Sequence, residues 1–193
     1  MSHELTAVDL PQLAERLDVI TAGLGDLLTH VRLDDISDSS NLRWRWGWSD
    51  LNEPDLERWH RGESLSLAGI GSMTILLGRH SLTFGCWIRW VEFVRDKHIQ
   101  KLTRQIVFRF ARFFHSKKAI YLPDSNSLTA EGAQNRVADG AHIDELLAYL
   151  AQSRPAATSI ESICTPVTSS VGGRTYETVE CDGYYVDKID EQS

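Results

Sequence analysis

The 193-residue sequence has no apolar run long enough to cross a membrane and no repeated unit. A transmembrane helix needs roughly 18 or more consecutive apolar residues, and charged residues interrupt every stretch of that length here. Residues 1–19 lack a basic region followed by an apolar stretch, so no signal peptide is predicted. A solenoid or propeller would show self-similarity at a period of about 20 to 50 residues. These absences predict a globular protein with no membrane association.

Cysteine is also rare. The three residues Cys86, Cys164 and Cys181 are an odd number and are widely spaced. A disulfide-stabilised secreted domain would carry a denser, even set. In a reducing compartment, isolated cysteines behave as small hydrophobic residues. The sequence therefore predicts free cysteines and a cytoplasmic location.

Common catalytic and nucleotide-binding motifs are missing. There is no GxSxG, GxGxxG, HExxH or phosphate-loop pattern, and the seven histidines have no cysteine at zinc-finger spacing. His142, Asp144 and Glu145 carry atoms that can ligate a metal. Their position at the start of an expected helix instead favours carboxylates that complement the helix dipole. We expect no catalytic residue, no metal and no cofactor, and hence a protein that is not an enzyme.

One alternative keeps an enzyme open. Asp124 and Ser125 follow an expected buried strand, where a carboxylate and a hydroxyl group could act together in catalysis. The sequence Pro-Asp-Ser-Asn at 123–126 is also typical of a turn, in which the aspartate accepts hydrogen bonds from nearby backbone N–H groups. We favour the turn, and an enzyme of unrecognised type that uses Asp124 and Ser125 remains the alternative.

Charge is distributed unevenly along the chain. The formal net charge is −7, but residues 89–118 carry +7 and the remainder carries −14. In an expected helix over 96–115, Lys97, Lys101, Arg104 and Arg112 fall on the face opposite the apolar one. This basic face either complements the acidic remainder or binds a nucleic acid or another anionic surface. The net acidic charge and the lack of a recognised motif make nucleic-acid binding the less favoured interpretation.

Hydrophobic periodicity predicts helices and strands in blocks rather than in strict alternation. The expected helices cover residues 10–28, 53–60, 96–115 and 141–152. The expected strands cover residues 42–48, 72–77 and 80–90, and a further strand runs from 117 until Pro123 ends it. A polar loop follows that strand. After the last helix, two or three more strands are expected, joined at Gly172 and Gly173. This pattern predicts one α+β domain over residues 1–193, a mainly antiparallel sheet with helices packed on one face. Residues 1–8 and 191–193 are expected to be flexible ends.

The densest aromatic segment is LRWRWGWSD at 42–50. As a strand, it would place Trp44, Trp46 and Trp48 on one face. Such a face is costly to expose to water, and the leucines of helix 10–28 need a surface to cover, so we favour a core strand. The alternative is a platform for a partner, which would include Trp48 near the end of the strand.

The C-terminal segment combines aromatic and acidic residues. Tyr184 and Tyr185 stand beside Asp182 and Asp187, a composition that suits either an edge strand or a contact surface for a basic protein.

Two stretches of the last 75 or so residues resemble a known class of protein. AIYLPDS (119–125) with the later helix IDELLAYL, and GYYVDKID (183–190), are similar to the C-terminal half of small α+β immunity proteins from bacterial toxin systems. The resemblance implies a cytoplasmic inhibitor that neutralises a cognate toxin domain by forming a tight complex. It implies partner contacts at Asp124, Tyr184, Tyr185 and Asp187, to which we add Trp48. The sequence leaves the oligomeric state open.

Overall fold

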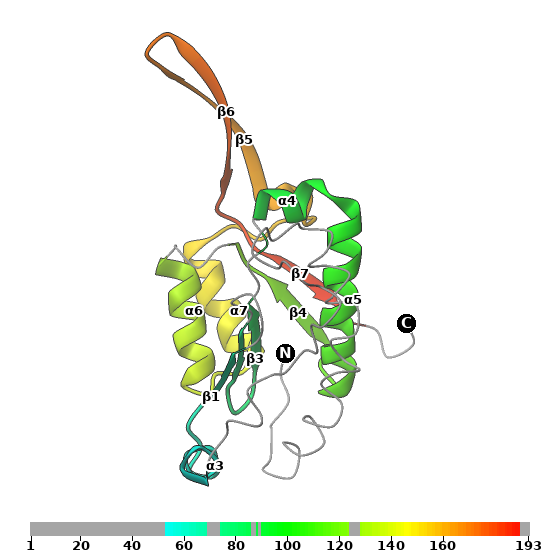
Figure 1. Ribbon diagram of the computed structural model, residues 1–193, viewed down its shortest axis with the longest axis vertical. Coiled ribbons are helices and arrows are strands. Elements are labelled where there is room, and N and C mark those ends of the chain that lie inside the picture. The colour runs from blue at the N-terminus through cyan, green and yellow to red at the C-terminus, as the bar shows by residue number, and fades with distance from the viewer. Residues whose placement is uncertain (1–52, 69–73, 86–87, 89, 124–127, 190–193) are drawn as a thin grey trace, which may run out of the picture.

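The computed structural model describes residues 53–68, 74–85, 88, 90–123 and 128–189 (Figure 1). The helices are α3 (Glu53–His60), α4 (Trp90–Arg95), α5 (Lys97–Phe113), α6 (Leu128–Ala138), α7 (Ile143–Ser153) and the 3-10 helix η4 (Glu161–Ile163). The strands are β1 (Leu65–Ala68), β2 (Thr74–Leu77), β3 (Leu82–Gly85), β4 (Lys118–Tyr121), β5 (Cys164–Val171), β6 (Arg174–Cys181) and β7 (Tyr185–Lys188). The predicted helix 10–28 and strand 42–48 lie outside the described residues.

The described strands form three small antiparallel sheets, which confirms the predicted α+β class. Their orders are β1-β2-β3, β4-β7 and β5-β6. Helix α5 packs against β4, and α6 packs against β2 and β3. The β5–β6 hairpin projects from this body as a long ribbon (Figure 1). No helix in the described ranges is both long and apolar enough to cross a membrane.

The hydrophobic core joins the first sheet to α5. Ile75 and Leu77 of β2 are fully buried, as is Phe110 of α5, and Ile106 is almost fully buried. Each such side chain contributes about 1.5–3 kcal/mol by leaving water. The apolar face predicted for the helix over 96–115 is therefore the face that the core requires.

Helix α5 begins where its sequence provides a cap. The Asp96 carboxylate accepts hydrogen bonds from the backbone N–H groups of His98 at 2.8 Å and Ile99 at 3.2 Å. These donors have no partner within the helix, so a side-chain acceptor at this position fixes its first turn. The short helix α3 and the helix α7 also lie where the periodicity predicts them.

Three local predictions were wrong. Strand β1 was not expected, and the strand predicted to run to Trp90 ends at Gly85, with Trp90 beginning α4 instead. Helix α6 occupies most of the predicted polar loop. It was missed because only Ala130 and Val137 are buried along it, which leaves no apolar stripe for the sequence to show.

Close backbone packing holds α6 against β2. A Cβ atom at Gly78 would lie 1.9 Å from the carbonyl oxygen of Val137, so only glycine fits at this crossing. On the other side of α6, the guanidinium of Arg136 lies over the ring of Tyr149 in α7, 3.7 Å from its centroid. These contacts make α6 part of the body.

Candidate functional site

The polar centre of the C-terminal half is an ion pair between α5 and β7. The Nε and Nη2 atoms of Arg104 donate to the two carboxylate oxygens of Asp187 at 3.0 and 2.8 Å. Asp187 is only 5% exposed, and it lies opposite Ala119 in the β4–β7 ladder. The two-pronged geometry satisfies both oxygens at once, so the buried charge is compensated.

Aromatic rings surround this pair. Tyr121 and Tyr185 lie opposite each other in the β4–β7 ladder with ring centroids 6.1 Å apart, and Phe93 stacks on Tyr121 at 6.0 Å. The hydroxyl group of Tyr121 is buried and meets no partner with hydrogen-bond geometry in the described part of the chain. Burial, together with the nearby Asp187 carboxylate, raises the pKa of Tyr121 above its usual value. The pKa of Tyr185 is raised by the same two causes.

The electrostatics of this cluster keep its groups in their usual charge states at neutral pH. Burial opposes the charged form of Arg104, but its hydrogen bonds to Asp187 and the carboxylate charge outweigh that effect and raise its pKa. A tyrosine with a raised pKa remains protonated at neutral pH. The Arg104–Asp187 ion pair joins α5 to β7.

The residues predicted to contact a partner differ in their exposure to solvent. Tyr184 is 5% exposed, and its backbone is fixed by hydrogen bonds with Pro155 and Ala157. Tyr184 and Asp187 are both buried, so they present little surface to a partner. Tyr185 is half-buried and keeps some exposed surface. Asp124, the neighbouring Ser125 and Trp48 lie outside the described residues, so contact at these positions stays a prediction.

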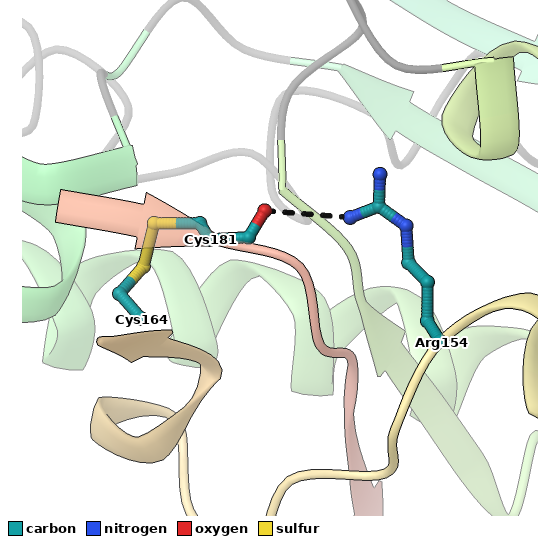
Figure 2. Close-up of a disulfide and its surroundings, with 3 residues drawn as sticks. All are labelled: Arg154, Cys164 and Cys181. Carbon is teal, nitrogen blue, oxygen red and sulfur yellow. Dashed lines mark hydrogen bonds between the residues drawn. A yellow bond between two sulfur atoms is a disulfide. The ribbon is translucent and has the colours of Figure 1, made fainter. Parts of the chain in front are cut away.

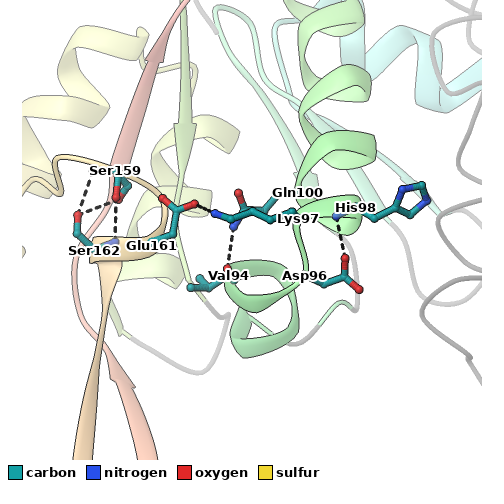
Figure 3. A network of polar contacts seen from close by, with 8 residues as sticks. All are labelled: Val94, Asp96, Lys97, His98, Gln100, Ser159, Glu161 and Ser162. Atoms are coloured by element: carbon teal, nitrogen blue, oxygen red, sulfur yellow. Dashed lines mark hydrogen bonds and ion pairs between the residues drawn. The ribbon is translucent and has the colours of Figure 1, made fainter.

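The basic face of α5 is partly neutralised by the acidic remainder. Lys97 forms a salt bridge with Glu161 of η4, which lowers the pKa of Glu161 to about 2 (Figure 3). Arg104 is paired with Asp187, as described above. Lys101 and Arg112 are exposed. Two of the four basic residues on this face therefore have acidic partners from other parts of the chain, and the other two are exposed.

Short-range polar contacts occur near the start of α5 and near η4. The Ser162 hydroxyl donates to the carbonyl oxygen of Ser159 at 2.9 Å, and the side chain of Gln100 donates to the carbonyl oxygen of Val94 at 2.8 Å (Figure 3). Figure 3 shows these contacts on the two sides of the Lys97–Glu161 pair. The serine contact lies in the segment that leads into β5, and the Gln100–Val94 contact joins α5 to α4.

No group of three potential metal ligands occurs among the described residues. At the start of α7, the Glu145 side chain accepts a hydrogen bond from the backbone N–H of His142 at 2.7 Å. Asp144 pairs with Lys118 of β4 at 2.7 Å, and this pair lowers the pKa of Asp144. Glu145 therefore caps the start of α7, whereas Asp144 links the same turn to β4.

Within the described residues, the β5–β6 hairpin is largely exposed, and we call it the arm (residues 164–181). Its two strands pair along eight positions and turn at Gly172 and Gly173, whose φ angles are +59° and +77°. Val171 at the tip is 67% exposed. Both positive φ values suit a two-residue hairpin turn of the type that follows the natural strand twist. The arm carries side chains that are mostly in contact with water.

A disulfide closes the base of the arm. Cys164 and Cys181 face each other in the ladder and are bonded, with their Cα atoms 4.1 Å apart (Figure 2). The prediction of free cysteines is therefore wrong for these two residues, because the hairpin register makes them neighbours. Cys86 lies outside the described residues. Arg154, at the end of α7, donates to the carbonyl oxygen of Cys181 at 3.5 Å and ties the arm to the body (Figure 2).

Comparison with known proteins identifies no relative: no protein-family model, no curated protein and no solved structure matches this chain.

Proposed function

We propose that this chain is a protein-binding inhibitor of the immunity type, which neutralises a toxin domain by forming a complex with it. The observation that carries the proposal is that the segments resembling immunity proteins pack as one unit. β4 and β7 form a ladder, the Lys118–Asp144 pair joins β4 to α7, and a parallel bridge between Ala156 and Tyr184 joins the end of α7 to β7. A resemblance to a single class of protein leads us to expect that these segments pack together.

Surface charge supports a basic partner. The chain has a net charge of −7, so at long range its field is that of an acidic protein. Acidic surfaces attract cationic proteins and raise their association rate, an effect that salt screens. A basic nuclease domain is the class of toxin that this charge fits.

The cytoplasmic location implied by the resemblance stays a prediction. A disulfide such as Cys164–Cys181 is typical of oxidising compartments, and in the cytoplasm thiol systems would keep both cysteines reduced. The proposal therefore requires that binding tolerate the dithiol form of the arm, or that the inhibitor act outside the cytoplasm.

Co-expression with any toxin domain encoded next to the gene for this chain tests the proposal. We expect rescue of cell growth and a complex that survives size-exclusion chromatography, with an association rate that falls as salt rises. Asp124→Lys should weaken the complex, and a non-cognate toxin of equal basicity serves as the control. Failure both to protect cells and to form a complex would contradict the proposal.

A further inference from the structure

The arm is a two-stranded ribbon with two outer edges. Within the described residues, no third strand pairs with β5 or β6. An unpaired edge presents a row of backbone N–H and C=O groups whose spacing matches another extended strand. The question is which backbone groups point outward from each strand.

Three observations fix the outward-facing residues. The Cα–Cα distance of 4.1 Å between Cys164 and Cys181 is typical of a pair that is not hydrogen-bonded in the ladder, so their backbone groups point outward. The carbonyl oxygen of Cys181 indeed accepts from Arg154, outside the hairpin. Seven positions along the register, Val171 and Arg174 flank the two-glycine turn, where a hydrogen-bonded pair is expected. Hydrogen-bonded and non-hydrogen-bonded pairs alternate along an antiparallel ladder, so the assignment made at the base agrees with the one made at the tip.

The two edges differ because of one proline. In β5, the outward positions are occupied by Cys164, Pro166, Thr168 and Ser170. In β6, they are occupied by Thr175, Glu177, Val179 and Cys181. Pro166 has no N–H group, so it removes a donor from the β5 edge, a known means of blocking strand addition. The β6 edge keeps every donor.

We propose that the β6 edge pairs in an antiparallel manner with the β6 edge of a second copy of this chain. Charge favours this partner and this direction. β6 begins with the basic Arg174 at the tip, while Glu180 and Asp182 lie at the base, and all three residues are exposed. Antiparallel pairing brings the tip of one arm beside the base of the other. The register that places Arg174 opposite Asp182 at both ends also places Glu177 opposite Val179 rather than opposite its own copy.

The same geometry explains why the assembly closes as a dimer. Pairing of β6 with its own copy has two-fold symmetry and uses the same surface twice, whereas β6-to-β5 pairing would continue without end. The incomplete β5 edge disfavours that second mode. An arm of eight residues spans about 27 Å, which holds the two acidic bodies farther apart than the Debye length of about 8 Å at physiological salt.

Two matched variants test the proposal by analytical ultracentrifugation of the full chain over a concentration series. Thr175→Pro removes an outward donor from β6, and Ser170→Pro removes one from β5 at the opposite position of the same pair. Both residues are exposed, and neither N–H is needed within the hairpin. We expect Thr175→Pro to raise the dimer dissociation constant by about tenfold or more, and Ser170→Pro to leave it unchanged.

Charge reversal provides a second test. Arg174→Asp should weaken the dimer, and adding Asp182→Arg should restore it. A wild-type chain that remains monomeric up to millimolar concentration would overturn the proposal. Equal effects of the two proline variants would also overturn it.

Hydrogen exchange of the backbone amides in the wild-type protein tests the proposal without any variant. The N–H groups of Thr175, Glu177 and Val179 should exchange freely in dilute protein and become protected as the dimer forms. Protection of these amides in the monomer would show that the chain itself already covers the edge, and the proposal would be wrong. A dimer in which they stay unprotected would exclude the β6 edge as its interface.

Discussion

Arg104 and Asp187 show how differently two partners of one ion pair depend on each other. The Asp187 side chain is 6% exposed, whereas 38% of the Arg104 side chain reaches water. A charge that can turn toward solvent loses little when its partner is removed, but a buried carboxylate that loses its cation has no substitute.

Arg104→Ala should therefore destabilise the protein more than Asp187→Asn. We expect a loss of about 3 kcal/mol for the arginine variant, which leaves a buried carboxylate unpaired, and about 1–2 kcal/mol for the asparagine variant. Urea unfolding followed by tryptophan fluorescence measures both. Equal losses would show that the pair acts through side-chain packing rather than through compensation of buried charge.

Tyr121→Phe is expected to be neutral or to stabilise the protein by up to about 1 kcal/mol. The Tyr121 hydroxyl is buried without a hydrogen-bond partner among the described residues, so its removal relieves the cost of desolvation and keeps the ring packed. The same urea titration measures the change. A loss greater than about 1 kcal/mol would reveal a hydrogen bond to that hydroxyl in solution.

At the scale of elements, local sequence patterns predicted more than long-range pairing. The spacing of Ile99, Ile106 and Phe110 identified α5, because a helix face repeats within a few residues. The Arg104–Asp187 pair joins positions 83 residues apart, and no local pattern announces such a contact. It fixes the orientation of α5 on β7 all the same.

The disulfide was within reach of the sequence. A hairpin centred on Gly172 and Gly173 places Cys164 opposite Cys181, since the two cysteines are equally distant from that turn. The number and spacing of the cysteines alone do not reveal this pairing, which follows from the predicted turn. The burial of Tyr184 was not predictable, because it depends on the bridge to Ala156.

Reduction of the disulfide should loosen the arm and leave the body folded. A two-stranded ribbon is marginal by itself, and a cross-link that closes a loop of about 15 residues contributes about 3 kcal/mol. With dithiothreitol, or in a Cys164→Ser/Cys181→Ser variant, limited proteolysis should cut between residues 165 and 180. The unfolding midpoint of the body should hardly change. A reduced arm that resists protease would mean that strand pairing alone maintains it.

The Lys97–Glu161 pair predicts a small dependence of stability on pH. The pKa of Glu161 is lowered to about 2 in the folded protein, so the pair stabilises above the usual glutamate pKa of about 4.3, and that contribution is lost as pH falls toward 2. Because both side chains are largely exposed, solvent limits the effect to below about 1 kcal/mol. Thermal unfolding of Glu161→Gln should show a shallower loss between pH 4.5 and 2 than the wild type. Identical profiles would show that the pair contributes nothing in solution.

For the whole molecule, the distribution of charge decides whether the basic segment can bind an anion. Residues 89–118 carry +7, but Lys97, Arg104 and Lys118 each have an acidic partner from another part of the chain. The molecule as a whole carries −7, which repels a polyanion at longer range. Local and overall electrostatics thus act in the same direction.

We therefore expect no binding of duplex DNA or heparin at 0.15 M salt, even at protein concentrations of about 100 µM, where non-specific binders are ordinarily detected. Fluorescence anisotropy of a labelled duplex measures this. The variant Glu161→Gln/Asp144→Asn releases Lys97 and Lys118 from their partners and lowers the net negative charge, so it should gain weak binding that disappears as salt rises. The basic residues are the same in both proteins. A gain of binding by the variant would therefore show that the ion pairs and the net charge, rather than a lack of basic residues, prevent binding by the wild type. Strong, salt-sensitive binding by the wild type would show that the basic face remains available despite its ion pairs, and would favour an anionic ligand over internal complementarity.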